Sequence, residues 1–192
     1  MRMQEPEPSK YRNLDARSLR GIAHPLRMQL LNALRRRGPA TASMLAERLG
    51  ESSGATSYHL RQLATHGFVE DAPERGKGRE RWWQAVDQGI DFDENLITDA
   101  DPAVRGAAET YLHEVSTMHA RELSTWVGTR QDWLPKWSHS HDMSDWTVRL
   151  TPERTRELVG KIHELLENYE AEDSPEAEQV RFHLHAFPTE SE

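Results

Sequence analysis

The chain has 192 residues, enough for one large domain or two small ones, and no stretch approaches the roughly 18 consecutive apolar residues of a membrane span. Cysteine is absent, which excludes disulfides and thiolate metal sites and suits a reducing compartment. The first ten residues contain no apolar run of the kind found in secretory signals. We therefore expect a cytoplasmic protein without membrane contact.

The net charge of −8 is distributed unevenly along the chain. Residues 17–86 contain 12 Lys and Arg against 6 Asp and Glu, whereas residues 87–192 contain 9 against 23. Such asymmetry is typical of a protein in which one part faces nucleic acid and another faces solvent or protein partners. An acidic half that serves only solubility is the alternative.

The chain begins with a segment that the composition predicts to be a disordered arm, residues 1–13, followed by two helices. Asp15 is a good N-cap for the first helix, which should end before His24, because a residue that precedes proline avoids helical geometry. Pro25 suits the first turn of the next helix, which should run to about Arg37 and stop at a Gly-Pro pair.

Two short helices are predicted next, at about residues 42–49 and 53–66. Thr41 and Ser52 can cap their first turns, and Gly50 suits a left-handed residue between them. Two short helices joined by a few residues around a glycine form a helix-turn-helix, although an ordinary helical hairpin has the same pattern.

A pair of strands is predicted at residues 68–72 and 79–86, and the connecting sequence PERGKG is basic and punctuated by glycine. Such a loop is typical of a wing that follows the phosphate backbone or reaches the minor groove of DNA. Residues 14–87 are therefore expected to form a winged helix-turn-helix domain, and residues 88–100 an acidic linker.

The pattern beyond the linker predicts a helical or α+β domain at residues 101–188, so that the whole fold is mainly α with small β parts. A helix of about 25 residues should start near Pro102, and its wide apolar stripe favours either a dimer seam or packing on helices of its own chain. A second helix, at about residues 151–169, lies between alternating segments at 146–150 and 180–187 that resemble strands. Its side chains expected to be buried are Leu158, Ile162, Leu165 and Leu166.

The second helix of a helix-turn-helix presents its first turns to base edges in the major groove. Small residues let the backbone approach the bases, hydroxyls bond to phosphate or base, and arginine can fork onto guanine or a phosphate. The start of the preceding helix and the wing would supply phosphate contacts. The predicted DNA-binding residues are Thr41, Ser43, Ser53, Gly54, Ser57, Tyr58, Arg61, Arg75, Lys77 and Arg79.

The motif HPLR at residues 24–27, the pattern SYHL-x-x-L-x-x-x-G-x-V at residues 57–69 and the Gly-Arg wing together resemble the ArsR-type winged helix-turn-helix regulators. The resemblance covers residues 14–86. It implies a homodimer that binds a pseudo-palindromic operator in double-stranded DNA, often as a repressor released by a signal. The metal-sensing members use cysteine pairs or His/Asp clusters, and this chain has no cysteine, so a cysteine-based metal sensor is not expected.

Other chemistry has little support in the sequence. His139, His141 and Asp142 carry donors that suit zinc or nickel, but a solvated loop is the preferred interpretation and no metal site is predicted. Trp133 and Trp137 nearby suit the pocket of a small-molecule effector. The chain has no glycine-rich phosphate loop, nucleophile elbow or HExxH motif, so neither an enzyme nor a cofactor is predicted.

Two rival functions remain open. The winged domain could be a protein-interaction module without sequence-specific DNA binding, with the acidic half docking the partner. The C-terminal half could instead act on a ligand as an enzyme. Retardation of promoter DNA in a gel, sensitive to salt and selective for sequence, would favour the regulator over the interaction module.

Overall fold

The computed structural model describes residues 11–72 and 81–189. The chain divides into two compact units, Met1–Glu122 and Leu123–Glu192. Within the described ranges, none of the helices combines the length and the apolar character that a membrane crossing requires.

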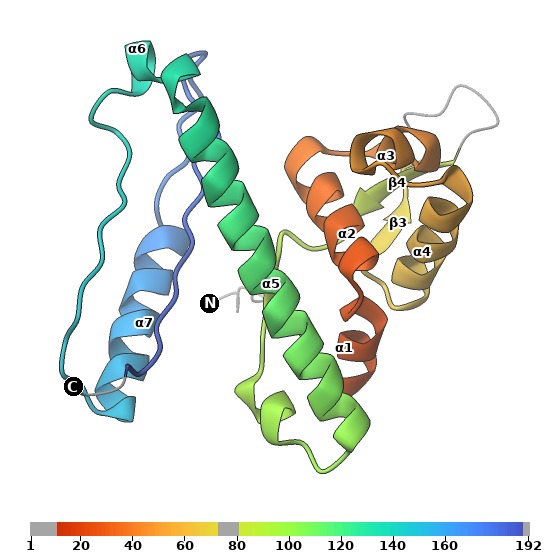
Figure 1. Ribbon diagram of the computed structural model, residues 1–192, viewed down its shortest axis with the longest axis horizontal. Helices are drawn as coiled ribbons and strands as arrows, with labels where there is room; N and C mark the ends of the chain where they lie inside the picture. Colours follow the sequence, from red (N-terminus) through yellow and green to blue (C-terminus); the bar gives the residue numbers. More distant parts are fainter. Residues whose placement is uncertain (1–10, 73–80, 190–192) are drawn as a thin grey trace, which may run out of the picture. The chain divides into compact units, whose positions relative to one another are not determined.

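The first unit combines a group of short helices, a three-stranded sheet and the first part of a long helix (Figure 1). Its elements in chain order are β1 (Tyr11–Asn13), α1 (Ala16–Ile22), α2 (Pro25–Arg37), β2 (Ala40–Thr41), α3 (Ala42–Leu49), α4 (Ser53–Thr65), β3 (Val69–Asp71), β4 (Trp82–Ala85), β5 (Gly89–Asp91), the 3₁₀ helix η2 (Glu94–Thr98) and most of α5 (Pro102–Thr129).

Side-chain caps set the boundaries of the short helices. Asp15 and Ser18 exchange side-chain to backbone hydrogen bonds at the start of α1, which forms a capping box. The hydroxyls of Thr41 and Ser52 accept hydrogen bonds from amides in the first turns of α3 and α4. Gly50 ends α3 in the left-handed conformation, with φ of 69°. The predicted helix starts are therefore confirmed.

The sheet has the order β2-β4-β3, and its neighbouring strands are antiparallel. The central strand β4 pairs Trp83 with Ala40 on one side and with Asp71 on the other. Trp83 is buried, whereas Trp82 is half-buried. The sheet therefore contributes one tryptophan to the core beneath the helices.

A single hydrophobic core joins the helices, the sheet and the long helix of the first unit. Val104, Ala108 and Tyr111 of α5 belong to this core together with residues of α1, α2, α4 and the sheet. The first turns of α5 thus pack on helices of their own chain, which was one of the two interpretations of its apolar stripe. Fully buried members of the core include Leu19, Ile22, Leu30, Leu31, Leu45, Leu60, Leu63 and Phe68.

Two segments that were predicted to lack regular structure contain ordered elements of this unit. β1 pairs in parallel with β5, so the predicted disordered arm does not extend to residue 13. Residues 88–100 are not a simple linker, because they contain β5 and η2, and Leu96 is buried in the core. The predictions failed because a three-residue strand has too little pattern to be seen, and its partner lies far away in the sequence.

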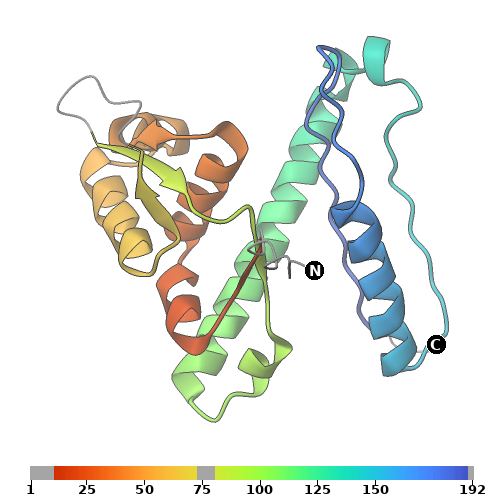
Figure 2. The ribbon, with the colours of Figure 1, turned by 180° about the vertical axis from the view of Figure 1, so that it is seen from behind.

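The second unit is helical, and no residue whose exposure is described there is buried. After the end of α5 it contains η3 (Arg130–Asp132), α6 (Leu134–Trp137) and α7 (Pro152–Glu167), which Thr151 caps as predicted. The chain before α7 and the chain after it run in an extended form along opposite sides of the helix (Figures 1 and 2).

Two predictions for this unit were wrong. The segments 146–150 and 180–187 form no strands, so the small sheet expected there is absent from the described structure. The apolar side chains of α7 are not buried either, since Leu158 and Leu165 are 45% and 65% exposed. Alternation and amphipathicity indicate a face that favours burial, but they do not identify what covers it.

Candidate nucleic-acid interface

α3, the turn at Gly50 and α4 form a helix-turn-helix. The amide of Glu51 donates to the carbonyl of Ala46, which tightens the turn after α3. Leu60 and Leu63 of α4 are fully buried in the core. This anchoring fixes which face of α4 points inward, so the opposite face is presented to solvent.

The exposed face of α4 carries four of the predicted DNA-binding residues. Ser53, Gly54, Tyr58 and Arg61 are exposed, and Ser57 is half-buried. Tyr58 is 52% exposed, although it is a large aromatic residue. In the described part of the chain, no heavy atom lies within 4 Å of the position that a Cβ on Gly54 would occupy, so the backbone there is open to a ligand. Their contacts with DNA remain predictions.

Arg61 is the cation of this face. Its side chain is exposed, and within residues 11–72 and 81–189 its guanidinium has no hydrogen bond or ion pair. An unengaged guanidinium keeps its donors for a phosphate or for the O6 and N7 atoms of guanine.

The start of α3 holds one buried and one exposed hydroxyl. Thr41 is 3% exposed, and its hydroxyl accepts the hydrogen bond of the Met44 amide. The predicted contact of Thr41 with a phosphate, through its side chain or its amide, stays a prediction. Ser43 is exposed in the first turn of α3, where a hydroxyl can reach the DNA backbone.

The predicted wing residues Arg75, Lys77 and Arg79 lie outside the described residues. Arg81 is described: its guanidinium donates to both carboxylate oxygens of Asp71 and lies 4.0 Å from the centroid of the Trp83 ring. The hydrogen bond from Arg81 lowers the pKa of the Asp71 carboxyl. Arg81 thus braces the strand pair at the base of the loop.

Two residues that sequence reasoning missed hold the end of α4. The Arg12 guanidinium donates to the carbonyls of His66 and Gly67 at 2.8 and 2.7 Å, and it lies 4.4 Å from the centroid of the Phe68 ring. Gly21 of α1 packs directly against the His66 ring. Arg12 was overlooked because it falls in the segment predicted to be disordered, and a helical glycine carries no pattern of its own.

Three histidines lie where α4 meets the preceding helices. The rings of His24 and His59 have centroids 4.4 Å apart, and the Nδ1 atoms of His59 and His66 are buried without a hydrogen-bond partner in the described structure. Burial lowers the pKa of all three imidazoles, and the nearby charge of Arg27 lowers it further. These rings are therefore packed in their neutral form at neutral pH.

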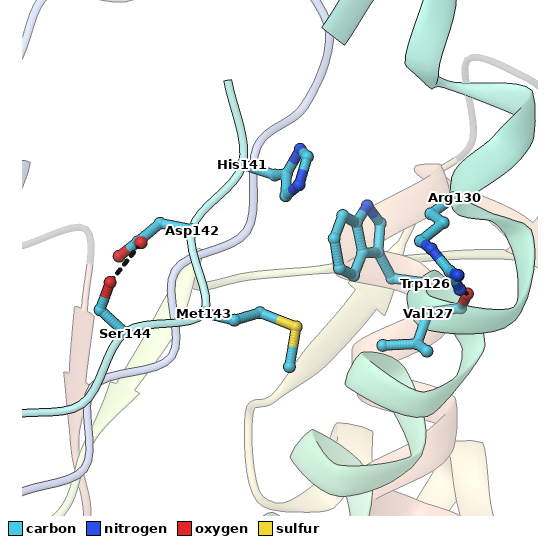
Figure 3. A pocket seen from close by; sticks show the side chains of 7 residues that line it. All are labelled: Trp126, Val127, Arg130, His141, Asp142, Met143 and Ser144. Atoms are coloured by element: carbon cyan, nitrogen blue, oxygen red, sulfur yellow. Dashed lines mark hydrogen bonds between the residues drawn. The ribbon is translucent and has the colours of Figure 1, made fainter. Parts of the chain in front are cut away.

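The second unit contains a pocket of about 600 Å³ (Figure 3). The His141 ring faces that of Trp126 with centroids 5.1 Å apart. The pocket does not include His139, Trp133 or Trp137, so the structure separates the predicted triplet and places a different tryptophan at the cavity. The described residues hold no group of three or more potential metal ligands. The lining residues are Trp126, Val127, Arg130, His141, Asp142, Met143 and Ser144.

Comparison with known proteins supports the assignment of the first unit. A family profile described as a helix-turn-helix domain matches residues 22–72, which include α2, α3, α4 and β3. A search of curated proteins found no match to the chain. The profile and the arrangement of α3 and α4 define a helix-turn-helix domain, and such a domain indicates a DNA-binding regulator.

Proposed function

We propose that the protein is an ArsR-like transcriptional regulator, most simply a repressor, that binds a pseudo-palindromic operator in double-stranded DNA as a homodimer. The observation that carries this proposal is the exposed face of α4, on which Gly54, Tyr58 and Arg61 lie together while Leu60 and Leu63 anchor the opposite face.

The chemistry of this face suits a major groove. Ser53 and Gly54 have small side chains, so the backbone in the first turn of α4 can approach base edges closely. Tyr58 offers a ring to thymine methyl groups and a hydroxyl to a phosphate. Arg61 can form a bidentate pair with guanine, which discriminates against a wrong base by roughly 1–3 kcal/mol.

The charge distribution favours the same interpretation. Residues 17–86 carry twice as many basic as acidic side chains, although the whole chain has a net charge of −8. A basic helix-turn-helix region followed by an acidic remainder directs DNA to the helix-turn-helix and away from the rest of the protein.

The pocket of the second unit supports a role in sensing. Trp126 and Met143 provide apolar surface, and Arg130, His141 and Asp142 provide polar groups of both charge signs. A small molecule with a flat apolar body and a few polar groups suits this lining. Its binding would regulate DNA affinity if it favoured one spacing of the two DNA-binding domains in the dimer over another.

The decisive experiment measures binding of the full chain to DNA from its own promoter region by fluorescence anisotropy at several salt concentrations, with scrambled DNA of equal length as competitor. We expect sequence-selective binding that Tyr58→Ala and Arg61→Ala weaken, each by about 10-fold or more. Arg149→Ala, an exposed arginine of the second unit, is the matched control and should bind as the wild type does. Equal affinity for promoter and scrambled DNA would instead favour the protein-interaction module.

A further inference from the structure

A small pocket lies between the start of α1 and the end of α4, within the first unit. Its volume is about 320 Å³, at the lower end of the roughly 300–1,000 Å³ range of small-molecule sites. Most of the side chains around it are polar, so the pocket suits a small polar ligand. They include Arg12, Asp15, Arg17 and Ser18 on one side and Thr65 and His66 on the other.

Arg17 gives this pocket a cation without a partner among the described residues. Its side chain is exposed, and its guanidinium has no hydrogen bond or ion pair within residues 11–72 and 81–189. The carboxylate of Asp15, which also lines the pocket, accepts hydrogen bonds from the amide and the hydroxyl of Ser18 in the capping box. The N–H donors of Arg17 therefore remain for a ligand.

Arg12 adds a second guanidinium, which the fold holds in place. It donates to the carbonyls of His66 and Gly67, and the Asp87 carboxylate lies 3.6 Å from it. Because a guanidinium carries five N–H donors, further donors remain after these two hydrogen bonds. Arg12 is thus a fixed donor, whereas Arg17 supplies the charge that Asp87 does not compensate.

The His66 ring lies in a positive potential. Burial lowers the pKa of His66, and the nearby charges of Arg17, Arg27 and Arg12 lower it further. Asp15 acts in the opposite direction. The Nδ1 atom of the ring is buried without a hydrogen-bond partner in the described structure. A positive potential beside unused N–H donors is what an anion requires of its site.

We propose that this pocket binds an oxyanion of the size of phosphate, with Arg17 as its main charged contact and Arg12 as a fixed second donor. A phosphate of bound DNA and the phosphate group of a free small molecule share this chemistry, because both present anionic oxygens to a fork of N–H donors. The pocket lies at the opposite end of α4 from Ser53 and Gly54, so it goes beyond the contacts of the proposed function and can be tested without DNA.

The first test titrates the isotope-labelled full chain with inorganic phosphate and follows its backbone amides by NMR, at an ionic strength held constant with sodium chloride. We expect saturable shifts centred on Arg17, Ser18 and His66. Arg17→Ala should weaken this binding by about 10-fold or more, because it removes a charge-assisted contact. Arg149→Ala is the matched control and should bind phosphate as the wild type does. Circular dichroism establishes that each variant keeps its helices.

The second readout uses sulfate, an oxyanion of similar size that does not titrate near neutral pH. An anion in the pocket offsets the charges of the arginines, so the pKa of His66 should be higher in sulfate than in chloride. His59 is not among the lining residues, and it serves as the internal reference whose pKa should not change. Phosphate shifts that do not saturate, or that are equal in the wild type and in Arg17→Ala, overturn the inference.

DNA binding at several salt concentrations distinguishes the two sources of the phosphate group. If Arg17→Ala lowers the slope of log affinity against log salt by about one, the pocket holds a phosphate of the DNA backbone. If the slope is unchanged, the Arg17-dependent site belongs to a free ligand. Phosphate binding that depends on Arg17 in a chain without selective DNA binding would support the inference while rejecting the proposed function. Selective DNA binding without phosphate binding would do the reverse.

Discussion

Gly21 of α1 lies so close to the imidazole of His66 at the end of α4 that no side chain fits between them. A Cβ built on Gly21 would lie 2.3 Å from Cγ of the His66 ring. Because Cγ is at the root of the ring, the imidazole cannot turn away cheaply. This contact fixes how closely α1 approaches the end of the helix proposed to enter DNA.

Replacement of Gly21 by alanine should therefore destabilise the protein by about 1–3 kcal/mol, as overpacking does in other cores. The measurement is the free energy of unfolding in urea. Gly106→Ala is the control, since no heavy atom of residues 11–72 and 81–189 lies within 4 Å of a Cβ at that helical position. Alanine there should stabilise α5 by roughly 0.5–1 kcal/mol. Equal stability of the two variants would mean that α1 does not pack on His66.

Arg12 should contribute more to stability than the other arginines that form ion pairs on this unit. Its guanidinium donates to two carbonyls at the end of α4 and lies 3.6 Å from the Asp87 carboxylate. Arg12→Ala should cost about 2 kcal/mol, and Arg12→Lys should recover only part of this loss, because an ammonium cannot replace a planar fork.

The comparison for Arg12 is Arg20→Ala, which removes an ion pair with Asp101 whose two side chains are about half exposed. That loss should be below about 1 kcal/mol. Urea unfolding of the three variants ranks them directly. If Arg12→Ala and Arg20→Ala cost the same, β1 is not held against the end of α4 as described.

The helix-turn-helix could be predicted from the sequence because its signals are local. Asp15, Thr41 and Ser52 cap helices within three residues of themselves, and Gly50 needs only its own left-handed φ. Arg12 could not be found in this way, since it acts on carbonyls more than 50 residues away along the chain.

The exposed face of α4 could be predicted from the same local pattern. Because Leu60 and Leu63 are buried, helical periodicity places the positions between them on the solvent side. Thr41 shows the limit of that reasoning, because the pattern that marks it as a helix cap does not show that its side chain is only 3% exposed. In the second unit, the amphipathic pattern predicted which face of α7 is apolar, but it did not predict that this face is exposed.

Stability should fall as the pH is lowered through the range in which histidine titrates. His24, His59 and His66 have pKa values lowered from the ordinary 6.5, mainly by burial. The unfolded chain therefore takes up protons before the folded chain does, so the free energy of unfolding should decrease as the pH falls through about 6.5 and should be nearly constant above about 7.5. Protonation of His24 would also end its acceptance of the Leu26 amide.

Urea unfolding at pH 7.5 and at pH 5.5 measures this effect. His59→Gln should reduce the difference between the two values, whereas His163→Gln, at an exposed position of α7, is the matched control. Equal losses of stability in the wild type and in His59→Gln would show that the His59 ring, which packs against His24, does not cause the pH dependence.

A substitution at Gly54 should change DNA binding without lowering the stability of the fold. Gly54 occupies the exposed side of the first turn of α4, and among the residues that the structure describes no heavy atom lies within 4 Å of a Cβ placed there. Gly54→Ala should therefore leave the fold as stable as the wild type or stabilise it by roughly 0.5 kcal/mol, because alanine favours helix. If DNA approaches the backbone at this point, the added methyl group should nevertheless weaken operator binding by about 10-fold. Urea unfolding tests the prediction for stability, and fluorescence anisotropy on the same preparation tests the prediction for DNA binding. Unchanged affinity would mean that the duplex does not come close to the first turn of α4, and the contact would then have to be sought nearer Arg61.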